Sequence, residues 1–252
     1  MLLTEQSWPA AEGLSRGIIQ VDCGPSDIER ARYYADLKLA TVNPHGPGGL
    51  LRNKQVVRNR LTAGKLADAA VGAWLQQACA MHPALPSGTV LLEYDRVRTD
   101  EFQYPDPYDL ALLTPEGVLR NMEVRASFSY RVGRPSTIAR KLSLYGWYST
   151  QNKAMEPEKD GYWQAFFYAR PEDLPAPEGF AQIPVFEDCL NQGKVTLYLV
   201  AGVSRALLER IGQTRKDQDQ AEYWAIYPAE RAWDIPEMTR RLLQSLHVRQ
   251  AA

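Results

Sequence analysis

The sequence predicts an α/β fold in which helices flank a mixed central β-sheet. Two observations indicate this class: a long amphipathic helix precedes a β-hairpin, and helices and strands alternate after the hairpin. A third is that 45% of the 252 residues are apolar, which provides enough material for a sizeable core. We expect a single domain over 1–252, with its core at about 60–170 and a C-terminal extension of sheet and helix at about 190–252.

The elements before the hairpin follow from helical spacing and from breaking residues. Apolar residues at helical spacing after a capping residue predict a helix over about 27–39, and the Gly- and Pro-rich stretch 43–49 predicts a loop. From Thr62 the apolar residues repeat with a period of 3.6, which indicates a helix that ends at Pro83. The β-forming run at 89–97 predicts the first strand.

Helices and strands alternate after the hairpin. The predicted elements are a helix from about Ser136 to 155, a strand at 161–170, a strand at 194–203, a helix at 204–212, a polar turn at 215–220, a strand at 221–228 and a terminal helix at 235–248.

The composition excludes several classes of protein. The formal net charge is -1, so the overall balance indicates neither a nucleic-acid nor a membrane partner. The three cysteines form no C-x-x-C pair and the three histidines no H-x-x-x-H pair, which argues against a disulfide framework and a zinc hydrolase. No leader-like segment or apolar run of membrane-spanning length is present, and we expect a cytoplasmic protein.

The segment 104–131 predicts a β-hairpin whose turn fixes the pairing of its strands. Pro115 presets the first corner of the turn and Gly117 accepts a positive φ, so Thr114 should pair with Val118. Counting outward in this register places two carboxylates, Asp109 and Glu123, directly opposite each other, with Cβ atoms about 4.5–5.5 Å apart.

Two like charges in this position call for compensation, since they destabilise a sheet by roughly 1 kcal/mol. One interpretation is a hard divalent cation such as Mg²⁺ held by Asp109 and Glu123. The alternative is that this face is exposed to solvent, where carboxylates cost little and Arg125 neutralises Glu123.

The pattern resembles the PD-(D/E)XK, or restriction-endonuclease-like, nuclease superfamily. The matching residues are Asp109 for the first acid, Glu123 and Arg125 for the E-x-K pair, and Asp68 for an acid on the preceding helix. The resemblance covers roughly 60–170, because the helix and the strand after the hairpin continue the family's order of elements.

Asp106 offers a second match for the first acid, because Pro105 and Asp106 spell the literal "PD". We prefer Asp109, which opens the apolar run and pairs with Glu123, whereas Asp106 precedes a proline and suits the cap of a turn.

The resemblance implies that Asp109, Glu123 and the carbonyl of Val124 bind Mg²⁺, for which Mn²⁺ can substitute, and that Asp68 supports them. The family's third residue is usually lysine, whereas this chain has Arg125, which remains protonated and can only orient water or stabilise phosphate charge. A lysine on the following helix, Lys141 or Lys153, can then take the vacant role.

The resemblance further implies a DNA endonuclease of the restriction or defence type, acting as a homodimer if it cuts both strands; RNA is not excluded as a substrate. The basic residues expected to contact phosphates are Lys65, Arg131, Arg134, Arg140 and Lys141. Two alternatives are a catalytically inactive nuclease-like domain that binds nucleic acid or protein, and an unrelated α/β protein with surface carboxylates.

Overall fold

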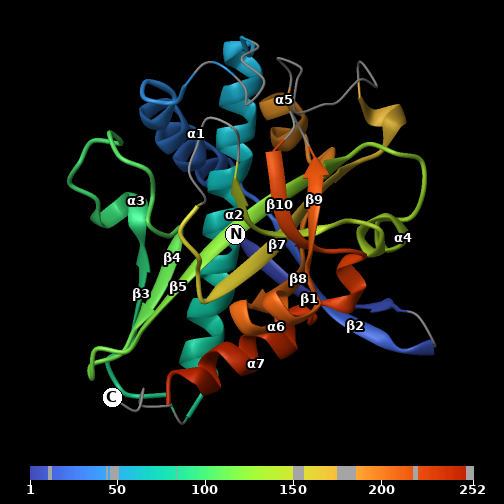
Figure 1. Ribbon diagram of the computed structural model, residues 1–252. Helices are drawn as coiled ribbons and strands as arrows, with labels where there is room; N and C mark the ends of the chain where they lie inside the picture. The colour runs from blue at the N-terminus through green and yellow to red at the C-terminus, as the bar shows by residue number, and fades with distance from the viewer. Residues whose placement is uncertain are drawn as a thin grey trace.

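The protein is described by a computed structural model, which forms a layered α/β structure (Figure 1). The described residues are 1–10, 13–43, 45, 51–83, 85–149, 156–174, 186–217 and 221–247.

A mixed seven-stranded sheet forms the centre of the molecule, as expected for this fold class. From one edge to the other its strands are β1 (Leu2–Pro9), β2 (Ser15–Asp22), β8 (Val195–Ser204), β7 (Gly161–Ala169), β5 (Leu119–Ser129), β4 (Leu110–Leu113) and β3 (Val90–Glu93). Strands β5 and β7 are parallel, and every other neighbouring pair in this sheet is antiparallel. The parallel pair requires the chain to cross over the sheet between β5 and β7.

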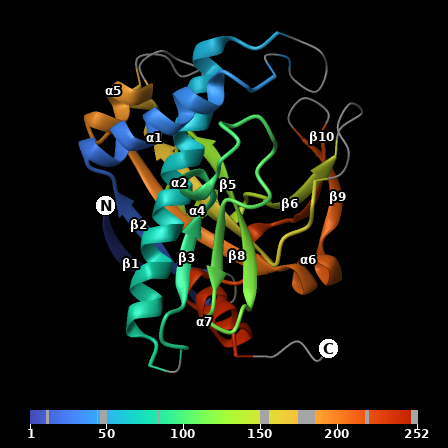
Figure 2. The same ribbon diagram turned by 90° about the vertical axis from the view of Figure 1, so that its left-hand side faces the viewer.

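Both faces of the sheet are covered, which explains why all nine residues of β7 are buried. The first face carries α1 (Pro25–Leu39), α2 (Lys54–Met81), α5 (Phe186–Asn191) and α7 (Ile235–Ser245), which share one apolar cluster with the sheet (Figure 2). The second face carries α4 (Pro135–Arg140), α6 (Arg205–Ile211) and a three-stranded sheet of β6 (Leu144–Ser149), β10 (Ala221–Ile226) and β9 (Gln213–Asp217).

Helix α2 is longer than its periodic stretch predicts, since it begins at Lys54 rather than near Thr62. The side chain of Asn53 caps it by accepting hydrogen bonds from the amides of Gln55 and Val56. Ten of its residues are buried against α1 and the sheet: Val57, Asn59, Thr62, Ala63, Leu66, Ala67, Ala70, Val71, Gly72 and Leu75.

The predicted hairpin register is confirmed. The Thr114 amide donates to the Val118 carbonyl at 3.0 Å, Gly117 has a φ of +82°, and Leu110 pairs with Met122. The face predicted to be core is buried and lies against α2: Leu110, Leu112, Met122 and Val124.

The helix predicted from about Ser136 to 155 is wrong beyond its first turns. Helix α4 ends at Arg140, and Leu144–Ser149 form β6, which pairs with β10; residues 150–155 lie outside the described part. At Gly146 a Cβ would clash with Leu208 and the Trp224 carbonyl, so the glycine permits close packing of the second sheet on α6. Tertiary packing of β-forming aromatic residues thus overrides the helical spacing.

Two further segments differ from expectation. The strand predicted at 89–97 ends at Glu93 and turns into the short helix α3 (Tyr94–Val97). Part of the predicted turn at 215–220 belongs to β9. The other predicted elements are confirmed within a few residues: α1, β7, β8, α6, β10 and α7.

Asp234 links α7 to the central sheet and provides a test of this packing. Its carboxylate accepts hydrogen bonds from the Glu237 amide at 3.0 Å, which caps α7, and from the Gly17 amide of β2 at 2.9 Å. We expect Asp234→Ala to lower the free energy of unfolding by about 2 kcal/mol in urea titrations. Asp234→Asn, which keeps one acceptor oxygen, should lose less; equal losses would contradict the dual role.

Candidate functional site

Asp109 marks the point where the hairpin ladder ends. Its amide donates to the Met122 carbonyl at 3.0 Å, and its carbonyl accepts from the Tyr94 amide at 3.1 Å. Beyond Leu110 the regular pairing stops, and Oδ2 of Asp109 accepts a hydrogen bond from the Val124 amide at 2.8 Å. The side chain therefore ties the start of β4 to β5 between Glu123 and Arg125.

On the α2 side, Asp109 lines a small cavity together with Lys65 and Asp68. The Lys65 ammonium lies 2.9 Å from Oδ2 of Asp68 and 2.8 Å from Oδ2 of Asp95, which belongs to α3. One helical turn separates Lys65 from Asp68, so α2 delivers both groups to the same edge of the cavity. Glu93, at the end of β3, also lines it.

Glu123 and Arg125 lie on the opposite face of β5 from α2, because side chains alternate along a strand. Glu123 is only 8% exposed, and its Oε1 lies 3.1 Å from Nη1 of Arg125. Arg125 also pairs with Glu156 and lies over the ring of Tyr148, whose neighbours on β6 cover this face. Arg125 therefore neutralises two carboxylates inside the protein.

Asp109 acts electrostatically on both sides of the sheet. Burial raises the pKa of Asp68 to about 7, with the charge of Asp109 adding to the rise. Burial also raises the pKa of Glu123 well above its ordinary value; Arg125 opposes this rise and Asp109 adds to it. Burial alone would lower the pKa of Lys65, but the surrounding aspartates outweigh it and hold that pKa well above its ordinary value.

The predicted cross-strand pair of Asp109 and Glu123 is wrong, because the ladder ends at Leu110 and the Asp109 amide already bonds to Met122. The structure brings Asp68 and Asp109 to one cavity and places Glu123 and Arg125 on the far face of the adjoining strand. Asp106, the rejected alternative, is bound in ion pairs with Arg98 and Lys38. It does not line the cavity.

The predicted phosphate-contacting residues do not form one surface. Arg131, Arg134 and Lys141 are exposed near α4, whereas Arg140 pairs with Glu230 at 2.7 Å. Lys65 is largely buried in its two ion pairs, so its charge is satisfied within the chain.

Three ionisable residues of the site were not anticipated from the sequence. Asp95 follows directly after β3, Glu156 pairs with Arg125, and Lys159 is a lysine only 2% exposed whose ammonium donates to the Pro157 carbonyl at 3.0 Å. The charge of Lys159 also acts on Glu123. An acid directly after a predicted strand is a usable signal for Asp95, whereas Glu156 and Lys159 come from a polar loop that sequence patterns do not place.

The carboxylates of the candidate site are suitable ligands for a hard cation such as Mg²⁺, but they do not form a complete set of protein ligands. Among the described residues, no three His, Cys, Asp or Glu side chains gather closely enough to hold a metal ion by themselves. Mg²⁺ is, however, commonly held by one or two carboxylates, water and substrate phosphates. Asp109 makes no ion pair within the described ranges, and its negative charge adds to the rise that burial causes in the pKa values of Asp68 and Glu123.

Comparison with known proteins adds one distant relative. No family model matches the chain, and no solved structure matches it significantly. The chain is 21% identical over 235 residues to "Uncharacterized protein MJECS01" of Methanocaldococcus jannaschii, an alignment that covers 88% of this chain and 83% of that protein. Within the described residues, no helix is both long and apolar enough to cross a membrane.

The raised pKa of Asp68 predicts a pH dependence of stability. The folded protein keeps a proton on Asp68 up to about pH 7, whereas an unfolded chain releases it near about pH 4. Stability from this group is therefore fully present below about pH 4 and is lost as the pH rises through about 7. Asp68→Asn removes this loss, so the unfolding free energy of the wild type should fall more steeply between these values than that of the variant.

Chemical denaturation at several pH values measures the two profiles. A difference that grows with pH, on the order of 1 kcal/mol or more in total, is expected. Parallel profiles would show that Asp68 ionises normally in the folded state.

Proposed function

We propose that the chain is a Mg²⁺-dependent endonuclease that hydrolyses phosphodiester bonds in DNA. The observation that carries the proposal is the position of Asp109, which has no ion-pair partner in the described ranges and whose charge acts on both Asp68 and Glu123. Asp109 lies at the end of the hairpin, between Asp68 on the α2 side and Glu123 on the far face of β5, and carboxylates are the donors that a phosphodiesterase metal requires.

The topology around these residues supports the same proposal. Helix α2 is followed by the antiparallel strands β3, β4 and β5, then by a crossover and by β7 parallel to β5. The helix, the hairpin and the later parallel strand follow the order that the resemblance to the PD-(D/E)XK superfamily implies, whereas the helix after the hairpin is reduced to α4. The candidate acids lie on the helix and the hairpin that the resemblance assigns to them.

In the proposed reaction, Asp109, Glu123 and the Val124 carbonyl would hold the metal. The bound metal would lower the pKa of a water molecule and neutralise charge on the scissile phosphate. Asp68 and its partner Lys65 would fix the α2 edge of the site, since each restrains the other.

Arg125 and Lys159 would divide the role that a single lysine usually fills. Arg125 stays protonated, so it can orient the phosphate or stabilise its developing charge but cannot accept a proton. Lys159 is buried near Glu123, where its positive charge could stabilise negative charge that develops on the phosphate. Lys141 is exposed beyond α4, and Lys153 lies outside the described residues.

A second candidate function is a nuclease-like domain that binds nucleic acid or protein without cleaving. The engagement of Arg125 with both Glu123 and Glu156 favours it, because these internal ion pairs neutralise charges that a substrate or metal would otherwise meet. The endonuclease proposal includes a restriction or defence role in the cytoplasm. It also includes a homodimer if the protein cuts both DNA strands.

Cleavage assays with matched carboxylate variants test the proposal. Plasmid DNA incubated with the protein and Mg²⁺ or Mn²⁺ should be cleaved, and Asp109→Asn or Glu123→Gln should reduce the rate by about 100-fold or more. Glu116→Gln is the control, since Glu116 is an exposed carboxylate at the turn of the same hairpin.

Three results would be decisive. Cleavage that survives both site variants, or that needs no divalent cation, contradicts the proposed site. DNA binding without cleavage by the wild type supports the non-catalytic alternative. If the folded protein neither cleaves nor binds DNA, the result supports the remaining alternative, an unrelated α/β protein with surface carboxylates.

Variants of the two basic residues test their separate roles. Lys159→Met should lower the cleavage rate by about 100-fold, because it removes a buried positive charge from the site. Arg125→Lys should retain most of the rate that Arg125→Met loses, because only a positive charge is required there. An unchanged cleavage rate in Lys159→Met would exclude a role for Lys159 in the reaction.

A further inference from the structure

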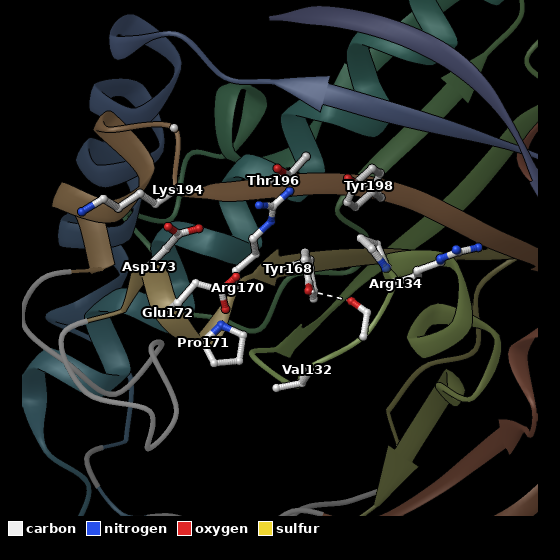
Figure 3. Close-up of a pocket in the computed structure, with 13 residues that line it drawn as sticks. Val132, Arg134, Tyr168, Arg170, Pro171, Glu172, Asp173, Lys194, Thr196 and Tyr198 are labelled. Atoms are coloured by element: carbon white, nitrogen blue, oxygen red, sulfur yellow. Dashed lines mark hydrogen bonds between the residues drawn. The ribbon is translucent and has the colours of Figure 1, made fainter.

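A second polar hollow lies at the ends of the parallel strands, away from the candidate site. It has a volume of about 520 Å³ and is formed where β5 and β7 end and β8 begins (Figure 3). Crevices beyond the carboxyl ends of parallel strands are frequent ligand sites in α/β proteins, and this volume is in the range of small-molecule pockets. Its lining includes none of the candidate carboxylates, although one lining residue, Arg134, is among the basic residues predicted to contact phosphates.

Three cationic side chains from three different loops line this hollow: Arg134 after β5, Arg170 after β7 and Lys194 before β8. None of them forms an ion pair within the described parts of the chain, although arginines elsewhere, such as Arg98 and Arg125, are held by two or more carboxylates. Figure 3 shows the Arg170 side chain pointing toward Thr196 and Arg134 at the opposite rim. Unpaired cations around one concavity provide donors for a phosphate.

The remaining polar groups of the hollow indicate that its ligand carries other polar groups besides an anionic one. Glu172 and Asp173 lie on the wall of the same hollow and would repel a purely anionic ligand. Carboxylates accept hydrogen bonds from sugar hydroxyls, as they do for ribose in dinucleotide sites. The hydroxyl of Tyr168 is already donated to the Gly133 carbonyl at 2.8 Å, which fixes that wall in place. The combination suits a ligand with both a phosphate and hydroxyl groups.

We propose that this hollow binds a nucleotide, with Arg170 and Lys194 contacting its phosphate, Arg134 closing the rim, and Glu172 or Asp173 accepting from its sugar hydroxyls. The proposal does not depend on nuclease activity, because the hollow shares no residue with the carboxylate site. A free nucleotide and the backbone of a nucleic acid offer the same phosphate chemistry, and the experiment separates these sources.

Calorimetric titration of the full chain with AMP, adenosine, inorganic phosphate and a short DNA duplex tests the proposal in the absence of divalent metal. AMP should bind, inorganic phosphate should bind more weakly, and adenosine should not bind measurably. The double variant Arg170→Ala/Lys194→Ala should weaken AMP binding by at least about tenfold, because it removes two charge-assisted contacts. Both side chains are exposed, so the variant should fold and melt like the wild type.

Arg210→Ala is the matched control, since Arg210 is an exposed arginine in the last turn of α6 and does not line the hollow. Its AMP affinity should remain within about twofold of the wild type. The proposal is overturned if AMP does not bind, if binding survives the double variant, or if the control loses affinity equally. Duplex binding that needs Arg170 and Lys194 while AMP fails to bind would assign the hollow to nucleic-acid phosphates instead. DNA cleavage is not a readout here, so failure of the nuclease proposal leaves this result intact.

Discussion

The need to compensate buried negative charge governs the architecture around the hairpin. Asp109 lies where the ladder of β4 and β5 ends, and it brings its charge to carboxylates on both faces of the sheet. One cation on each side of the sheet compensates this negative charge. Lys65 on α2 pairs with two aspartates, and Arg125 on β5 pairs with two glutamates. The pairs of Lys65 link α2 to α3, and those of Arg125 link β5 to the loop before β7. Removing either partner of such a pair would leave a buried charge without compensation.

The covering of both sheet faces explains how such charges come to be buried. Helices α1 and α2 close one face, and the smaller sheet with α6 closes the other, so β7 has no exposed residue. The smaller sheet brings Gly146 and Tyr148 against Arg125, so this side of β5 is partly shielded from solvent. The same crossover that makes β5 and β7 parallel also leaves the polar hollow at their carboxyl ends.

Local chemistry made part of the site predictable. Pro115 and Gly117 define the turn, and the turn defines the register, so Leu110 faces Met122 as expected. The sequence could not anticipate that the ladder stops at Leu110 and that the Asp109 carboxylate replaces a main-chain acceptor for Val124. Such a departure depends on the loop that precedes the strand, where Asp106 and Arg98 are held by ion pairs of their own.

The sequence by itself determined the fold class, the long helix and the hairpin register, since each depends on spacing or turn chemistry within a short segment. Only the tertiary structure decided that Leu144–Ser149 form a strand, that Lys65 is enclosed by aspartates, and that Glu156 and Lys159 join Arg125 and Glu123. These outcomes depend on contacts between segments distant in the chain, where packing outweighs local propensity and no short pattern records which partners will meet.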